Sequence, residues 1–129
     1  MSDGELPALR WRARWVAVGW ILVALIVIAS LAPLGKRGGL AGLDKLEHFL
    51  GYALLMFWFA ALHAPPRRVW FAIAFVALGA ALELAQGATG WRRADSFDLL
   101  ADALGVAVGW ILAHRYGIAA FRHAERAAR

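Results

Sequence analysis

The chain has 129 residues, of which 62% are hydrophobic and only 18% are charged, and its formal net charge is +5. Soluble domains are roughly half apolar, and a domain of this size leaves too much surface in water to hide so many hydrophobic side chains, so a water-soluble fold is excluded. The sequence has no cysteine, which excludes disulfides, thiolate metal ligands and a cysteine nucleophile.

Four apolar stretches follow one another along the chain, separated by segments that contain Pro, Gly or charged residues. Each is close to the length that an α-helix needs to cross about 30 Å of hydrocarbon at about 1.5 Å per residue. We predict transmembrane helices over about residues 15–34, 46–64, 68–88 and 98–114. The connections are short, so the expected fold is an all-α, four-transmembrane-helix bundle that forms a single domain over residues 1–129.

The first apolar stretch follows Arg10, Arg12 and Arg14, a pattern that also begins secretory signal peptides. The stretch is long for the apolar region of a signal peptide, and three further apolar stretches come after it. We therefore expect it to remain in the protein as the first membrane helix.

Basic residues are divided unevenly between the two ends of the predicted bundle. The N-terminal arm, the second connection and the C-terminal tail carry more Lys and Arg than the first and third connections do. The positive-inside rule then places both termini in the cytoplasm and the first and third connections outside. The expected location is an inner (cytoplasmic) membrane, which the protein crosses several times.

Polar side chains occur at the outward ends of three predicted helices. His48, Glu83 and Asp102 lie inside apolar stretches, where an ionisable group costs roughly 2.5–3.5 kcal/mol, so we expect them to face one another at one depth rather than lipid. These three are also the candidates for catalytic residues. The side chains that we expect to bind a ligand are Asp44, Lys45, His48, Tyr52, Glu83, Gln86, Arg92, Arg93, Asp98 and Asp102.

Some of the acidic residues have a simpler interpretation. Asp44 precedes Glu47 by three residues, and Asp95 precedes Asp98 by three, which is the spacing of helix N-terminal caps. For Asp44, Glu47 and Asp95 we expect capping to be the main role.

A purely structural network is the alternative for the residues inside the helices. In that interpretation Glu83 pairs with Arg92 or Arg93, and His48 forms a hydrogen bond with Asp102, so that the polar groups hold the helices together.

Three motifs appear in order at the outward helix ends. They are Asp44-Lys45-x-x-His48-Phe49-x-x-Tyr52, then Glu83-x-x-Gln86, then Arg92-Arg93 followed by Asp98-x-x-x-Asp102-x-x-Gly105-x-x-x-Gly109. In this order the motifs resemble the VanZ-like family of small integral membrane proteins, over residues 33–109. The chain departs from the family at Asp102, where Asn is common. The founding member is associated with low-level resistance to the glycopeptide antibiotic teicoplanin, so the resemblance implies a role in the bacterial cell envelope.

A binding role is the first expectation. Arg92 and Arg93 suit the phosphate of a lipid or of a lipid-linked cell-wall precursor, and the carboxylates suit hydroxyls, amines or a bridging cation. The alternative is an enzyme in which His48, Glu83 and Asp102 form a divalent-metal site or an acid/base pair acting on a lipid headgroup. No metal motif of defined spacing, such as HExxH, is present, so we predict neither a metal nor another cofactor.

Other partners follow from packing and charge. Gly105 and Gly109 form a small-xxx-small track that lets a neighbouring helix approach closely, so a third alternative is a non-catalytic assembly factor that forms an oligomer through this track. Transport is disfavoured because four short helices give one chain too little wall to enclose a path. Nucleic-acid binding is not expected, since the basic tail lies beside anionic membrane lipids.

Overall fold

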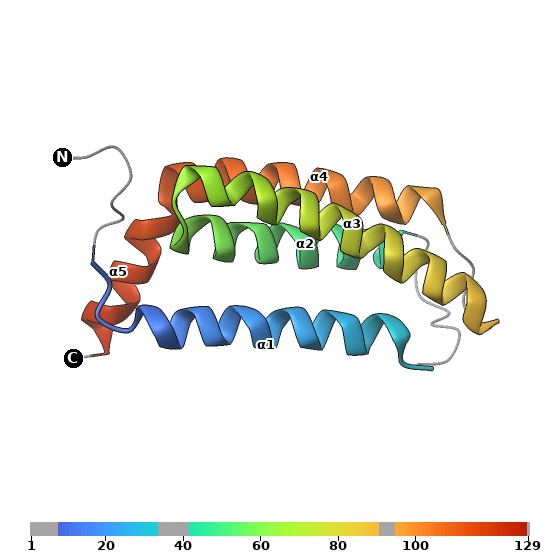
Figure 1. Ribbon diagram of the computed structural model, residues 1–129, viewed down its shortest axis with the longest axis horizontal. Coiled ribbons are helices and arrows are strands. Elements are labelled where there is room, and N and C mark those ends of the chain that lie inside the picture. Colours follow the sequence, from blue (N-terminus) through green and yellow to red (C-terminus); the bar gives the residue numbers. More distant parts are fainter. Residues whose placement is uncertain (1–7, 34–41, 91–94, 129) are drawn as a thin grey trace.

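The computed structural model describes residues 8–33, 42–90 and 95–128 (Figure 1). Within these ranges every regular element is a helix, which confirms the predicted all-α class. The elements are α1 (Arg12–Leu31), α2 (Leu43–Leu62), α3 (Pro65–Thr89), α4 (Ser96–Leu112), the π-helical turn η1 (Ala113–Gly117) and α5 (Ile118–Ala127).

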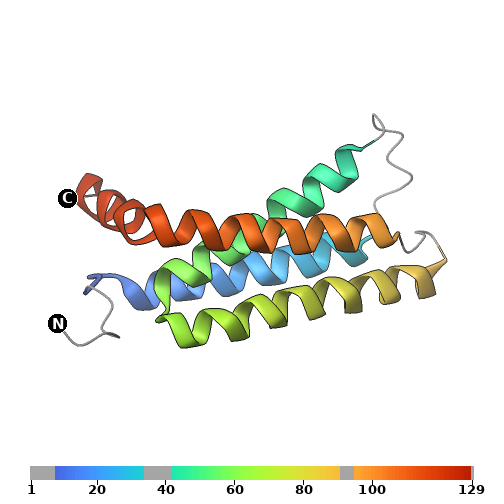
Figure 2. The ribbon, with the colours of Figure 1, turned by 90° about the horizontal axis from the view of Figure 1, so that it is seen from above.

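The four long helices form an antiparallel bundle. Figure 1 and Figure 2 show α1, α3 and α4 along the long axis, with α2 inclined between them and α5 turning away from α4 across one end. That end, where α1 and α3 begin, is called the arginine end, because it carries Arg10, Arg12, Arg14, Arg67, Arg68, Arg115, Arg122 and Arg126. The opposite end is called the acidic end, and it carries Asp44, Glu47, Glu83, Asp95, Asp98 and Asp102.

Three segments of the described chain are long and apolar enough to cross a membrane, namely α1, α3 and the continuous helical segment Ser96–Ala127. Their outer faces expose large hydrophobic side chains, which water would disfavour and lipid accepts. These side chains include Trp20, Ile21, Leu25 and Ile28 on α1, Ile73 and Leu84 on α3, and Leu100, Leu104 and Ile111 on α4. The structure therefore supports a multi-pass membrane protein.

The helix α2 is the central helix of the bundle, and it is not one of these three segments. Its first two turns carry Asp44, Lys45, Glu47 and His48. The rest of α2 supplies most of the buried core, with Tyr52, Leu55, Met56, Phe59, Ala60, Ala61 and Leu62. Because the other helices cover it, α2 meets less lipid than they do.

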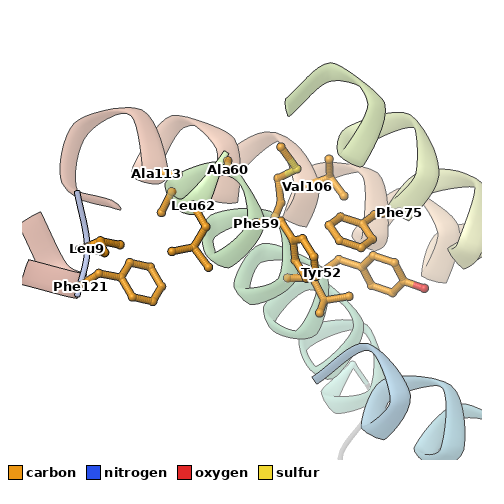
Figure 3. Close-up of a cluster of buried hydrophobic side chains, with 12 residues drawn as sticks. Leu9, Tyr52, Phe59, Ala60, Leu62, Phe75, Val106, Ala113 and Phe121 are labelled. Carbon is orange, nitrogen blue, oxygen red and sulfur yellow. The ribbon is translucent and has the colours of Figure 1, made fainter. Parts of the chain in front are cut away.

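Phe59 lies at the centre of the core. Its ring centroid is 5.2 Å from that of Trp20 on α1, and 4.7 Å and 5.3 Å from those of Phe71 and Phe75 on α3. Figure 3 shows Tyr52 beside this cluster, with its hydroxyl group pointing away from the other labelled side chains. The aromatic core thus ends at Tyr52, one helical turn from His48.

Gly105 and Gly109 are buried on α4 where it packs against α2, its most extensive partner. A Cβ atom at Gly105 would collide with the backbone oxygen of Phe49, and one at Gly109 with that of Ala53. The glycine track therefore serves packing inside the chain. An oligomer formed through the same track stays a prediction, since the contacts described here are those within one chain.

The helices begin two or three residues earlier than predicted. Pro65 is the first residue of α3, where its missing N–H is not needed by the helix, so the Pro-Pro pair starts α3 rather than preceding it. Gly42 precedes α2 with φ of 97°, and no side-chain cap is found for that helix among the described residues, so Asp44 is not its N-cap. Asp44 lies in the first turn of α2, where its negative charge suits the helix dipole. Asp95 does cap α4, as predicted, and its side chain accepts a hydrogen bond from the N–H of Phe97.

The last predicted helix does not end near residue 114. It continues through η1 into α5, and the additional residue in a π-helical turn shifts which side chains face the bundle. Phe121 is 3% exposed and packs against Trp15 and Trp58, with ring centroids 5.2 Å and 4.9 Å away. The basic tail is therefore the polar face of an amphipathic helix.

Candidate functional site

A cluster of polar side chains lies at the acidic end, where α2 and α4 begin and α3 ends. The Nδ1 atom of His48 lies 2.9 Å from Oδ1 of Asp102, which is hydrogen-bonding distance. Lys45 donates to Oδ2 of Asp95 at 2.7 Å and to Oδ1 of Asp98 at 3.1 Å. These contacts join α2 to the beginning of α4 through charged groups.

Glu83 brings α3 into the same cluster. Its Oε2 atom accepts a hydrogen bond of 2.8 Å from the backbone N–H of Asp95. Glu83 is only 6% exposed, and its Oε1 atom is buried and has no hydrogen-bond partner among the described residues. A buried carboxylate oxygen without a partner is costly, so Glu83 is the side chain most in need of an external group.

Two further buried oxygens in this region have no partner within the described ranges, Oδ2 of Asp102 and the hydroxyl of Tyr52. Asp102 is 0% exposed. Its carboxylate fits against α3 because residue 79 is glycine. The polar cluster therefore extends inward from the helix ends toward the aromatic core.

A pocket of about 270 Å³ lies beside the cluster, between the end of α3 and the beginning of α4. Its lining residues are Ala80, Glu83, Leu84, Asp95, Ser96 and Leu99. Two carboxylate-bearing residues thus line a cavity that is otherwise mainly apolar. Pockets that bind small molecules run from roughly 300 to 1,000 Å³, so this one has room for a headgroup rather than for a complete lipid.

Three side chains of the cluster can also offer ligand atoms to one ion. One atom from each of His48, Glu83 and Asp98 lies within 4.8 Å of the others, and the three residues come from α2, α3 and α4. Nε2 of His48 is 3.9 Å from Oδ2 of Asp98. Because these three residues lie on separate helices, no motif of fixed spacing joins them in the sequence.

The structure brings most of the predicted site residues together and separates others. Lys45, His48, Glu83, Asp98 and Asp102 all belong to the cluster. Asp44 stays at its edge, half exposed and 3.9 Å from Nζ of Lys45. Gln86 contacts α1 instead, because its side-chain N–H donates to the backbone oxygen of Ser30 at 2.9 Å. Arg92 and Arg93 lie outside the described residues.

Asp95 and Gly79 also shape the polar cluster, although neither is among the residues predicted to bind a ligand. Asp95 was assigned to capping alone, yet it also binds Lys45 and, through its backbone, Glu83. The hydrogen bond from Lys45 holds the pKa of Asp95 below its ordinary value. Gly79 is four residues before Glu83 on α3, so the helical repeat places both on one face, and this spacing is the signal that the sequence offered.

At the arginine end, arginine side chains donate hydrogen bonds to backbone oxygens at the end of α2. Arg12 donates to the backbone oxygen of Leu62 at 2.6 Å, and Arg68 donates to that of His63 at 2.9 Å. These contacts suit the free carbonyl groups and partial negative charge at the end of α2. Glu125 is the acidic residue of this end among those that the structure describes.

No protein-family model, curated protein or solved structure matches the chain.

Proposed function

We propose that the chain is a VanZ-like membrane protein of the bacterial cell envelope, that α1 to α4 all cross the cytoplasmic membrane, and that both termini are cytoplasmic. The gathering of arginines at one end supports this orientation, because the cytoplasmic side of membrane proteins is enriched in Lys and Arg. The central position of α2 supports the fourth span, since a helix that leads from the acidic end to the arginine end inside the bundle must cross with its neighbours.

Because the chain contains no cysteine, single cysteines can test this topology. We expect Thr89→Cys to react with a membrane-impermeant maleimide in intact cells and Arg67→Cys to react only after permeabilisation. Reaction of Arg67→Cys in intact cells would contradict the proposed orientation. Reaction of both variants in intact cells would contradict the crossing by α3.

At the acidic end, we propose that the protein binds the polar headgroup of a membrane lipid or of a lipid-linked cell-wall precursor. The observation that carries this proposal is Glu83, which lines the pocket and has a buried oxygen without a partner among the described residues. A hydroxyl or amine of a headgroup would donate to that oxygen. The exposed neighbour Leu84, 74% accessible, lies in the same pocket wall and can contact the apolar part of the same lipid.

The test is lipid mass spectrometry on protein purified in mild detergent, with Glu83→Gln as the variant. A hydrogen bond to a charged group contributes about 1.5–3 kcal/mol, so the amount of the bound lipid class should fall roughly 10- to 100-fold. Glu47→Gln is the matched control, because Glu47 is an exposed acid on α2 that does not line the pocket. Equal lipid content in wild type and Glu83→Gln, both folded, would count against headgroup binding here.

An enzyme is the second candidate, and the hydrogen bond between His48 and Asp102 favours it. A carboxylate that orients a histidine is a common arrangement for general acid/base catalysis. Incubation of the purified protein with phospholipids and lipid-linked precursors would show product if this candidate is correct. Teicoplanin susceptibility of cells expressing wild type or Glu83→Gln is the matching cellular readout for either candidate.

A further inference from the structure

We propose that His48, Glu83 and Asp98 bind one divalent transition-metal ion, with zinc as the ion to test first. The three side chains each place a ligand atom within 4.8 Å of the other two, and each comes from a different helix. The proposal goes beyond headgroup binding, which requires no metal.

The orientation of His48 suits a metal ligand. Its Nδ1 atom faces Asp102 at 2.9 Å, and its Nε2 atom faces Oδ2 of Asp98 at 3.9 Å. Histidines that bind metals usually donate their other ring N–H to a carboxylate, which fixes the ring and leaves one nitrogen for the ion. Asp102 is therefore a positioning residue that acts through His48.

In each of the two carboxylates, one oxygen accepts a hydrogen bond from the protein, and we assign the other oxygen to the ion. Asp98 accepts from Lys45 through Oδ1, and its Oδ2 is the atom that faces His48. Glu83 accepts the backbone N–H of Asp95 through Oε2, and its buried Oε1 has no partner within the described ranges. A cation bound to that oxygen would remove the cost of burying it without a partner. The unpaired oxygen thus points to a ligand independently of the spacing of the three side chains.

The charge of the cluster also favours a cation. Glu83, Asp98 and Asp102 are all buried carboxylates. Lys45 donates a hydrogen bond to one of them, Asp98. Buried charges are stable only when they are paired or coordinate a metal. One divalent ion would balance two of the three carboxylates.

The donor set distinguishes between metals. One imidazole nitrogen with two carboxylate oxygens suits zinc and similar transition metals, whereas magnesium and calcium prefer oxygen ligands alone. Zinc binds such atoms at about 2.0–2.2 Å, so ligands of one ion lie about 3.3 Å apart. The ligand atoms lie within 4.8 Å of one another, so the three side chains would have to move closer together around the ion. Glu83 belongs both to this group and to the lining of the pocket. Any coupling between the metal ion and a bound headgroup would therefore act through Glu83, and only that coupling rests on the proposed function.

The test uses the full chain in detergent, stripped with a chelator and titrated with zinc chloride in the absence of added lipid. All proteins carry His114→Asn and His123→Asn, because these exposed histidines can hold adventitious zinc. We expect one zinc ion per chain by elemental analysis, and a cobalt-substituted protein whose visible d–d absorption bands differ from those of aqueous cobalt. Zinc should also raise the unfolding temperature, since an ion that binds only the folded state stabilises it.

The ligand variants give the decisive comparison. Glu83→Gln and Asp98→Asn should each weaken zinc binding more than about 100-fold, and Asp102→Asn about 10- to 100-fold. Glu47→Gln should bind zinc as tightly as the parent protein does. The proposal is overturned if the folded parent binds no zinc, or if Glu83→Gln and Asp98→Asn bind it as tightly as the parent. Lipid analysis of chelator-treated protein separates this failure from a failure of headgroup binding.

Discussion

A Cβ atom at Gly79 would lie 2.5 Å from Oδ2 of Asp102, so the carboxylate of Asp102 occupies the space that a side chain at position 79 would take. The other oxygen of the same carboxylate is 2.9 Å from Nδ1 of His48. Asp102 on α4 thus contacts α3 on one side and α2 on the other. The position of the histidine depends on a residue of α3 that has no side chain at all.

The first prediction follows from this contact. Gly79→Ala should lower the free energy of unfolding by about 1–3 kcal/mol, the usual cost of forcing extra volume into a packed site. This loss is measured by unfolding both proteins in detergent and monitoring the transition by circular dichroism. In the cobalt-loaded protein the same variant should change the absorption spectrum, because Asp102 can no longer hold His48 in place.

Gly51→Ala is the control for that variant. A Cβ atom at Gly51 would lie 3.5 Å from Cδ1 of Ile26, which is an ordinary van der Waals contact. Alanine has the higher helix propensity by about 1 kcal/mol, so Gly51→Ala should be neutral or stabilising. Equal destabilisation by the two substitutions would mean that the effect of Gly79→Ala has nothing to do with Asp102.

A second prediction concerns the track of small residues on α4. Gly109→Ala places its new methyl group against the backbone oxygen of Ala53, which cannot rotate away as a side chain can. The expected loss is at least about 2 kcal/mol, because overpacking that moves a backbone is at the costly end of the usual range. Light scattering of the protein–detergent complex should show an unchanged number of chains. A lower number of chains with unchanged stability would instead assign the track to an oligomer.

Hydropathy along the sequence predicted the helices well, because lipid requires long apolar segments whatever their neighbours are. It did not predict that α2 is central, since burial within a bundle and exposure to lipid both select apolar residues. It also missed α5, whose apolar face depends on the π-helical turn η1 bringing Phe121 against Trp15. That contact joins residues far apart in the sequence.

The polar cluster could be predicted in outline because ionisable groups in apolar segments are costly unless they meet. His48 and Asp102 are the clearest example, at 2.9 Å from one another. The pairing of Lys45 with Asp98 could not be read from spacing, because the two residues lie on different helices. Gln86 was predicted to bind a ligand, and its hydrogen bond to the backbone of α1 was not anticipated. Every residue has a backbone oxygen, so the sequence does not show which one a side chain will contact.

The third prediction concerns the way α5 holds the beginning of α1. Glu125 accepts hydrogen bonds from the backbone N–H groups of Arg10 and Trp11 at 3.0 Å and 2.8 Å, and from the indole N–H of Trp15 at 3.0 Å. Glu125→Ala leaves these donors unpaired, which costs about 1–3 kcal/mol for each buried group that water does not reach. We expect α5 to separate from the bundle more often in this variant.

Limited trypsin digestion measures that separation, because Arg122 and Arg126 lie on α5. Cleavage at these residues should be several times faster in Glu125→Ala than in wild type, while the four long helices stay intact. Glu125→Gln keeps one acceptor oxygen and should give an intermediate rate. If both variants are cleaved at the wild-type rate, Glu125 does not hold α5 in place.

The last prediction is a pH dependence at the arginine end. His63 is 8% exposed and lies between α2 and α3, with its Nδ1 atom 2.8 Å from the backbone oxygen of Phe59. Burial lowers the pKa of His63, and the nearby charges of Arg12, Arg67 and Arg68 lower it further, against the opposing effect of the hydrogen bond to Phe59. The folded protein therefore favours the neutral ring.

The sign of the effect on stability follows from this shift. An unfolded histidine has a pKa of about 6.5, so below that pH the unfolded chain binds a proton that the folded chain still rejects. The contribution of His63 is complete above about pH 6.5 and is lost as the pH falls toward the lower pKa of the folded state. The unfolding temperature should thus drop between about pH 7.5 and about pH 5.5 by more in wild type than in His63→Asn, which keeps a donor near the Nδ1 position but does not titrate. The histidines at positions 48, 114 and 123 are present in both proteins, so the difference between the two curves isolates His63. Parallel curves would show that His63 takes up its proton equally in the folded and unfolded states.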